Sequence, residues 1–390
     1  MTGQKCKDSA NMLLNRQITK PIYPSGVVPR TRLHTQYAGW QERRAIVVHA
    51  PSGYGKSTLL SHWLDVAGLG GQAAWLTLDE SDSEPLRFVD ALAAAMEPVI
   101  PGASAAIRPI LEDQQGAAAR ALSRLLGVVE EAAPVPAAPD SHLLLVLDDV
   151  HRAQSPAIDE LLTTVLEHGP RTLHTILLSR GAPSLPLARL YAHGALSLLT
   201  ADDLRFTEAE VNAYLLSTGF ASPSAADVRE LTGRCEGWIA ALRLGILAEP
   251  RRDRVTALCT RGENGRDWIS NYLVEEVLQR QTGEVRRFLL ETSLLDAFNA
   301  PLCAAVTGVD HAQDMLSAIV RADLFIIALD GAGEWFRYHH LFQELLQRHL
   351  RSDRGDRTLA ELHRRAAVWL ADTGQVADAV GHLLAAGDIE

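Results

Sequence analysis

Cysteine and long apolar runs are both scarce in this chain of 390 residues, and each scarcity excludes a class of protein. The four cysteines are Cys6, Cys235, Cys259 and Cys303. None lies within four residues of another, which excludes a C-x-x-C redox pair or a zinc knuckle and favours a reduced, cytoplasmic protein. No apolar run approaches about 18 residues, so no membrane span is expected. Residues 8–20 also lack the apolar core of a signal peptide.

Lysine is scarce as well, because 33 of the 37 basic residues are arginine. The only lysines are Lys5, Lys7, Lys20 and Lys56. The 48 acidic residues give a net charge of −11, whereas a chain built as a whole to bind nucleic acid normally has a basic face. Two arginine-rich segments are interpreted as solvated helix faces, Arg251–Arg254 and Arg348–Arg365. Hydrophobic residues make up 47% of the chain and charged residues 22%, as in globular proteins.

Residues 45–199 alternate short aliphatic runs with helix-like stretches. The predicted strands are Ala45–His49, Ala73–Leu78, Leu143–Leu147, Thr175–Leu178 and Ala195–Leu199. The predicted helices cover about 57–66, 85–98, 116–132 and 155–168. Apolar strands separated by helices indicate a parallel sheet with helices on both faces. A stretch rich in alanine and proline, residues 132–141, is interpreted as a surface loop.

Helices dominate after about residue 205. Residues 207–260 look helical, and Thr207 followed by Glu210 is a capping-box pattern. A further helix is predicted over 267–281, and short helices follow it. Two apolar runs, Leu324–Leu329 and Trp335–Tyr338, flank a turn at Gly331–Gly333. A hairpin after helices is the layout of a winged helix.

The last segment, residues 358–386, is predicted to form two antiparallel helices broken at Gly374. Alternating small and large apolar residues in these helices are typical of helical repeats. One helix pair cannot bury its own apolar faces well, so we expect the chain to be a fragment of a longer protein.

The most informative motif joins the first predicted strand to the helix after it. The residues Ala50-Pro51-Ser52-Gly53-Tyr54-Gly55-Lys56-Ser57-Thr58 form a P-loop, except that Ala50 replaces the first glycine. Glycines let the backbone N–H groups turn toward an anion, and the helix directs its positive end there. The lysine can bridge the β- and γ-phosphates, and the Ser57 hydroxyl can hold Mg²⁺. The alternative is a glycine-rich turn without a ligand.

Acidic and basic residues follow two other predicted strands. Asp148 and Asp149 end the run Leu143–Leu147. Ligands bind at the carboxyl ends of parallel strands, so Asp148 is a candidate Mg²⁺ ligand and Asp149 a candidate to orient or deprotonate water. Arg180, after the strand Thr175–Leu178, is a candidate sensor of the γ-phosphate. The alternative for the two aspartates is a polar strand end that caps the next helix, and the alternative for Arg180 is a solvated arginine. His151 is interpreted as a structural residue at a helix start.

Together these motifs predict an α/β P-loop NTPase domain, with a parallel sheet and helices on both faces, followed by helical, winged-helix and repeat-like parts. The expected segments are an N-terminal arm (1–26), the nucleotide-binding domain (27–204), a helical domain (205–264), a winged-helix domain (265–352) and the start of a TPR-like helical repeat (353–390).

Several motifs, taken together, resemble the MalT-like STAND ATPases, which are bacterial transcription activators of the LuxR type. In the nucleotide-binding part the matching segments are Ala50–Thr58, Trp75–Glu80, Leu143–His151 and Leu178–Arg180. Downstream they are Glu236–Trp238, Tyr272–Leu278, Phe288–Leu295, Ala300–Cys303 and Phe336–Phe342. The resemblance covers about residues 26–390.

This resemblance implies further roles. Val28 and Arg30 would border the adenine, and His339 would contact the β-phosphate of ADP in a closed form, with His340 as an alternative that the sequence leaves open. A histidine pair beside an aromatic hairpin could equally be core packing. Gly237-Trp238 stands where relatives carry a Gly-x-Pro motif near the nucleotide, but Ile239 replaces the proline. ATP would permit self-association after a small-molecule inducer binds to repeats outside this chain, and DNA would be bound by a helix-turn-helix outside it.

Three functions compete at this point. The first is an ATP/ADP signalling switch with slow hydrolysis, in which each ligand shifts the conformational equilibrium by its differential affinity. The second is a turnover P-loop ATPase of the motor or kinase type without a transcriptional role. The third is a scaffold with a degenerate site, which the intact Lys56, Ser57 and Asp148 argue against.

Overall fold

The computed structural model describes residues 18–23, 26–37, 39–112, 117–132, 142–220, 223–248, 273–322, 324–329 and 334–388. The chain forms two compact units, Met1–Ala50 with Tyr54–Leu204 and Pro51–Gly53 with Arg205–Glu390. Several expected features lie partly or wholly outside the described residues, namely the arm at 1–26, the loop at 132–141, the start of the helix at 267–281, the turn at 331–333 and the segment 251–254.

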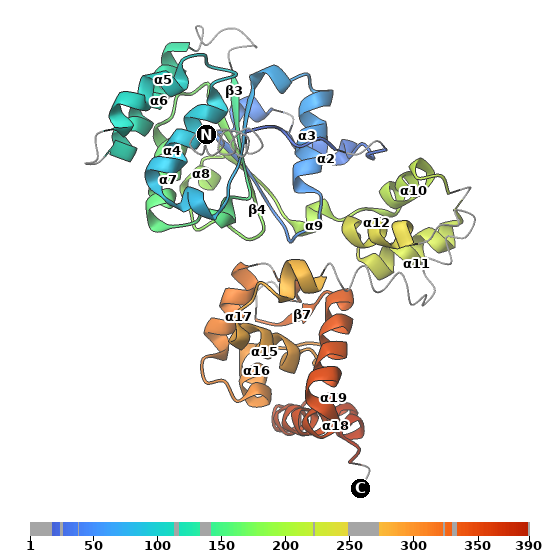
Figure 1. The fold of residues 1–390 in the computed structure, drawn as a ribbon. Coiled ribbons are helices and arrows are strands. Elements are labelled where there is room, and N and C mark those ends of the chain that lie inside the picture. Colours follow the sequence, from blue (N-terminus) through green and yellow to red (C-terminus); the bar gives the residue numbers. More distant parts are fainter. Residues whose placement is uncertain are drawn as a thin grey trace, which may run out of the picture. The chain divides into compact units, whose positions relative to one another are not determined.

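The first unit is built on a five-stranded parallel sheet (Figure 1). Its strands are β1 (Ala45–His49), β2 (Ala73–Thr77), β3 (Leu143–Asp148), β4 (Leu173–Ser179) and β5 (Leu196–Leu199). The spatial order is β2-β3-β4-β1-β5, and every neighbouring pair is parallel. All five predicted strands are confirmed. Because β4 lies between β1 and β3, the carboxyl ends of these three strands meet at one edge.

Helices cover both faces of this sheet, as predicted. Figure 1 shows α2 (Thr31–Tyr37) and α3 (Lys56–Val66) on one side, and α4 (Pro85–Met96), α5 (Ala103–Leu111), α6 (Ala117–Ala132) and α7 (Pro156–His168) on the other. The shorter helices are α8 (Ala188–Ala192) and α9 (Ala201–Leu204). Helices α2 and α5 were not predicted from the sequence. Both are short, and α5 contains Pro109, which weakens its helical signal.

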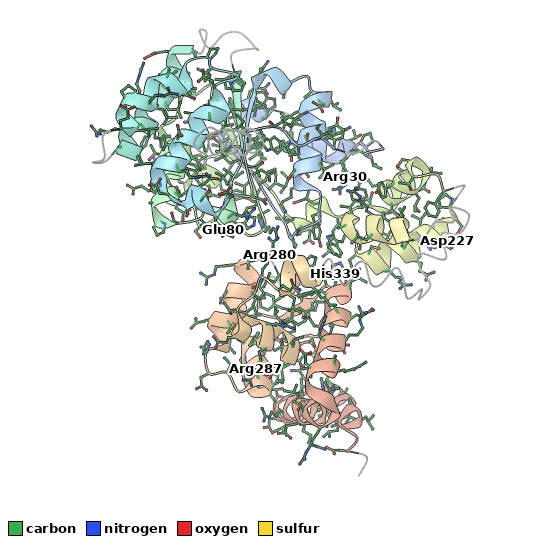
Figure 2. The ribbon with its side chains drawn as sticks, in the orientation of Figure 1. Arg30, Glu80, Asp227, Arg280, Arg287 and His339 are labelled. Atoms are coloured by element: carbon green, nitrogen blue, oxygen red, sulfur yellow. The ribbon has the colours of Figure 1, made fainter. Side chains whose placement is uncertain are left out.

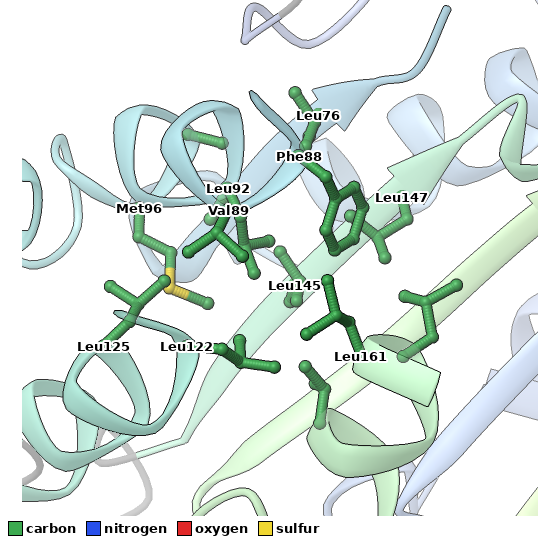
Figure 3. Close-up of a cluster of buried hydrophobic side chains, with 14 of the residues drawn as sticks. Leu76, Phe88, Val89, Leu92, Met96, Leu122, Leu125, Leu145, Leu147 and Leu161 are labelled. Carbon is green, nitrogen blue, oxygen red and sulfur yellow. The ribbon is translucent and has the colours of Figure 1, made fainter. Parts of the chain in front are cut away.

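A hydrophobic core lies between the sheet and helices α4–α7 (Figure 3). Leu145 and Leu147 of β3 face this core, where Phe88 and Leu92 of α4 pack, and all four side chains are buried. Side chains alternate between the faces of a strand, so the intervening Val146 points to the opposite face, and it is buried as well. Burial on both faces explains why β3 is continuously apolar in sequence.

The second unit is mainly helical. It contains α10 (Glu208–Ser217), α11 (Ala225–Cys235), α12 (Ile239–Ala248), a π-helical turn (Val274–Leu278), α15 (Gly283–Thr292), α16 (Ala300–Thr307), α17 (Ala312–Arg321), β6 (Ile326–Ala328), β7 (Phe336–Tyr338), α18 (His340–Asp372) and α19 (Val376–Ala386). Strands β6 and β7 pair antiparallel, which confirms the predicted hairpin. The capping box of Thr207 and Glu210 also forms at the start of α10.

One helix differs from the prediction. The first helix of the C-terminal pair was expected to begin near residue 358, but α18 runs without a break through the 33 residues His340–Asp372. This range contains no proline, and its single glycine is Gly355, so nothing in the local sequence stops the helix. The predicted break at Gly374 is confirmed. None of the helices in the described ranges, α18 included, is both long and apolar enough to cross a membrane.

Candidate functional site

The loop between β1 and α3 has the backbone of an anion cradle. Gly53 and Gly55 both adopt φ of 81°, a left-handed conformation that residues with a side chain rarely adopt. Gly55 is the N-cap of α3, and no side chain caps this end in the described structure. The start of α3 directs its N–H groups and its positive end toward an anion bound by the loop.

Ala50, the departure from the P-loop pattern, is compatible with this cradle. The residue is completely buried, and its N–H donates to the Ser179 carbonyl at 3.2 Å. It is not among the residues with positive φ, so it does not need the freedom of glycine. Its carbonyl accepts a hydrogen bond from the Lys56 ammonium at 2.6 Å. This bond holds Lys56, which is only 8% exposed, against the loop.

Asp148 ends β3 beside the start of α3. Its carboxylate is 5% exposed and accepts hydrogen bonds from the Ser57 side chain and, at 2.9 Å, from the Asp149 N–H. Burial raises the pKa of Asp148 to about 6, and the charge of Asp149 adds to this, while Ser57 and the Lys56 ammonium oppose it. A hydroxyl and a carboxylate in contact are the oxygen ligands that Mg²⁺ prefers. The residues present therefore fit a magnesium ion.

Asp149, His151 and Arg180 lie at the same edge of the sheet. The His151 ring nitrogen Nδ1 is 3.9 Å from the Asp149 carboxylate, and it has no hydrogen-bond partner among the described residues although it is buried. Burial lowers the pKa of His151 to about 4, against the opposing charge of Asp149, and the nearby cations Arg180 and Lys56 lower it further. His151 is therefore neutral at pH 7. It belongs to a 3-10 helix, Val150–Arg152, as its interpretation as a helix-start residue predicts.

The segment before α2 is tied to the end of the first unit. Arg30, labelled in Figure 2, is 5% exposed, and its guanidinium donates to the Leu204 carbonyl at 3.0 Å. Its own carbonyl accepts hydrogen bonds from the N–H groups of Leu33 and His34 at the start of α2. Val28 is buried two residues earlier. These contacts fix the position of the segment, and its predicted contact with adenine stays a prediction.

His339 lies in the core of the second unit. His339, which is labelled in Figure 2, is the N-cap of α18 and only 1% exposed. Its Nε2 is 3.3 Å from the Cys235 carbonyl, and its ring packs edge-on against Trp238 and Phe325. The predicted contact between His339 and a phosphate stays a prediction, and the side chain of His340 is outside the described residues.

The resemblance places Gly237-Trp238 near the nucleotide, but two side-chain contacts around residues 236–238 were not predicted from the sequence. Glu236 accepts hydrogen bonds from both terminal nitrogens of Arg337, at 2.9 and 3.2 Å. The Trp238 indole N–H donates to the Ser52 carbonyl of the P-loop at 3.0 Å. The partners are 101 and 186 positions apart in the sequence, and no local pattern indicates such pairs.

Two family models match this chain. Residues 30–178 match the AAA ATPase domain, a range that includes the P-loop, Asp148 and Asp149 but ends before Arg180. Residues 274–358 match the MalT winged helix domain, which includes the β6–β7 hairpin and His339. The resemblance to MalT-like proteins and the predicted fold class are therefore confirmed. Nucleotide binding follows from the ATPase domain.

The matching curated relatives carry two different names. The chain is 33% identical over 380 residues to the HTH-type transcriptional regulator MalT of Cronobacter sakazakii, which covers 97% of this chain and 41% of the relative. It is 34% identical over 372 residues to the serine/threonine-protein kinase PknK of Mycobacterium tuberculosis strain H37Rv, which covers 95% of this chain and 33% of the relative. The chain thus spans about two fifths of the length of the first relative and one third of the length of the second.

A solved structure supports the fold. The Walker-type ATPase of Pyrococcus abyssi matches with a TM-score of 0.57 at 12% identity, over 84% of this chain and 99% of that one. At this identity the likeness shows the fold alone.

Proposed function

The chain combines an AAA ATPase domain with a MalT winged helix domain, and on this premise we propose that it is the ATP- and ADP-binding switch of a LuxR-type transcription regulator. The observation that carries the nucleotide part is the contact of Ser57 with the buried Asp148, directly beside Lys56 at the positive end of α3.

In this proposal, each side chain of the site has a distinct task. The N–H groups of the loop and of Thr58 at the start of α3 bind the phosphates, and Lys56 leaves the Ala50 carbonyl to bridge the β- and γ-phosphates. Ser57 and Asp148 hold Mg²⁺, which when bound neutralises phosphate charge. Asp149 orients or deprotonates the attacking water, and Arg180 senses the γ-phosphate. Val28 and Arg30 border the adenine, and Tyr54, whose side chain is buried, belongs to the phosphate-binding loop.

Signalling rests on a population shift rather than on turnover. ADP favours a closed form, in which His339 contacts the β-phosphate, and ATP favours self-association after an inducer binds to repeats outside this chain. DNA is bound by a helix-turn-helix outside this chain, and the protein acts in the cytoplasm. Slow hydrolysis of ATP resets the switch. The MalT name of relatives that match 97% of the chain supports this proposal.

The first test of the proposal is to denature the purified chain and identify the nucleotide that it releases. Stoichiometric ADP is expected from the unmodified chain, and none from Lys56→Ala, because the loop loses its phosphate-binding cation. Lys20→Ala is the matched control, since Lys20 pairs with Asp65 on the surface. An empty protein with brisk steady-state ATP hydrolysis would instead favour a turnover enzyme.

The closed form has a separate test. If His339 contacts the β-phosphate, His339→Ala releases ADP at least about tenfold faster, since the variant loses one hydrogen bond to a charged group. Fluorescent ADP displacement measures the rate. Unchanged ADP retention would remove His339 from the site and leave the other residues in place.

A further inference from the structure

We infer that Trp238 is a positioning residue for the P-loop, and that through Phe325 and His339 it links the state of the loop to the winged-helix domain. The inference rests on the proposed function, because it assigns Trp238 to the same nucleotide site. Its evidence lies within the second unit, which includes Pro51–Gly53 of the loop.

The first turn of the loop is held by two hydrogen bonds from residues 238–240. The Trp238 indole N–H donates to the Ser52 carbonyl at 3.0 Å, and the Ala240 N–H donates to the Gly53 carbonyl at 3.2 Å. These carbonyls belong to consecutive peptide units. In a trans peptide the C=O and the following N–H point in opposite directions. Fixing the two carbonyls on the Trp238 side therefore turns the N–H groups of Gly53 and Tyr54 to the other side, where a P-loop binds phosphate.

The packing at this contact leaves little freedom. A Cβ atom on Gly53 would lie 2.6 Å from the Ala240 Cβ and 2.7 Å from the Trp238 Nε1, both far closer than atoms can pack. Glycine is therefore required at position 53 for two reasons. It leaves room for Ala240 and Trp238, and it adopts a φ of 81°. Trp238 is completely buried, so its indole cannot turn away to solvent without opening this core.

The same indole packs against the winged-helix domain. Its ring centroid is 5.0 Å from that of Phe325 and 5.8 Å from that of His339, both in edge-on contacts. The His339 N–H donates to the Phe325 carbonyl at 2.7 Å, which joins these two residues. A displacement of Trp238 must therefore be accommodated by both.

The turn that presents Trp238 is itself anchored on both sides. The Phe206 N–H donates to the Gly237 carbonyl at 2.9 Å, and a Cβ atom on Gly237 would lie 2.8 Å from the Phe206 backbone. The preceding Glu236 is paired with Arg337 of β7. A turn held in this way transmits a movement of the loop to the hairpin and α18, instead of absorbing it.

The test compares two tryptophan variants. Trp238→Phe keeps an aromatic ring but loses the donor to Ser52, and we expect its affinity for ADP and ATP to fall about tenfold. Trp75→Phe is the matched control, because Trp75 is equally buried and donates to the Thr77 hydroxyl at 3.1 Å, away from the loop. Its affinity should stay within about twofold of the unmodified chain. Fluorescent nucleotide titration measures the affinities, and thermal melting without nucleotide measures the cost to stability.

Wild-type affinity in Trp238→Phe would overturn the inference, as would equal losses of affinity in both variants. If the unmodified chain binds no nucleotide, the proposed function itself is wrong. A second measurement needs no variant. Hydrogen exchange of the unmodified chain should show added protection on ADP binding, both at the Ala240 amide and in the segments around Phe325 and His339. If the Ala240 amide is protected but the winged-helix segments are unchanged, the link to that domain is wrong.

Discussion

At the scale of single residues, Asp148 is a carboxylate whose negative charge is unfavourable in its buried position. Its carboxylate is buried next to Asp149, and the hydrogen bond with Ser57 and the charge of Lys56 compensate only in part. The pKa of Asp148 therefore rises from 3.8 to about 6. A divalent cation bound by Ser57 and Asp148 would remove this penalty.

The raised pKa predicts the effect of Asp148→Asn on stability. A folded-state pKa above the unfolded value stabilises the protein at low pH, and this contribution is lost as the pH rises through about 6. Without nucleotide and magnesium, Asp148→Asn should therefore raise the free energy of unfolding at pH 8 by up to about 3 kcal/mol, and by little at pH 4. Urea unfolding at both pH values measures this. Asp90→Asn, on the exposed face of α4, is the surface control for the substitution.

The same residue predicts how magnesium-dependent nucleotide binding responds to pH. The protonated carboxyl is a poor metal ligand, so the affinity for Mg²⁺-ATP should fall as the pH drops below about 6. Affinity in the presence of EDTA should change much less. Titration between pH 5 and 8 tests this, and an affinity for Mg²⁺-ATP that is constant over this range would contradict the role of Asp148 as a magnesium ligand.

At the scale of secondary-structure elements, the start of α10 is determined locally. The Thr207 hydroxyl accepts from the Glu210 N–H at 3.3 Å, and the Glu210 carboxylate accepts from the Thr207 N–H at 2.9 Å. Thr207→Ala should lower the free energy of unfolding of the second unit by about 1 kcal/mol, since one N–H of the first turn loses its partner. The control is Thr164→Ala inside α7, expected to change stability by less than about 0.5 kcal/mol.

The hairpin depends on a long-range ion pair instead. The Glu236 side chain is 11% exposed and bound by both nitrogens of Arg337, with Arg205 at 3.4 Å. Arg337→Met should destabilise the second unit by about 1–3 kcal/mol, because a charge in a largely buried position loses its bidentate partner. A double-mutant cycle with Glu236→Gln isolates the pair. Strictly additive losses would show that the two side chains do not stabilise each other.

At the scale of the whole molecule, nucleotide binding should raise the temperature at which the folded chain unfolds, because the ligand binds the folded state. ADP at 100 times its dissociation constant should stabilise the site by about 2.7 kcal/mol, provided that it does not bind the unfolded chain. Differential scanning calorimetry should show this shift in the unmodified chain and in Lys20→Ala, but not in Lys56→Ala. A shift that persists in Lys56→Ala would place the nucleotide elsewhere.

The sequence alone determined the local features of this protein. Five strands, most of the longer helices, the capping box and the P-loop were predicted, because each depends on side-chain periodicity or on contacts a few positions apart. The candidate residues Lys56, Ser57 and Asp148 could be proposed for the same reason, since each directly follows a strong strand or opens a helix. The unbroken α18 was missed, because the change from winged helix to repeat suggested a boundary that no helix-breaking residue imposes.

Only the tertiary structure decided which of these residues meet. The order of the strands places β4 between β1 and β3, and burial then raises the pKa of Asp148. The pairing of Glu236 with Arg337 and of Trp238 with Ser52 joins residues 101 and 186 positions apart. Such contacts depend on how elements pack and how charge is desolvated, and neither is encoded in a short window of sequence.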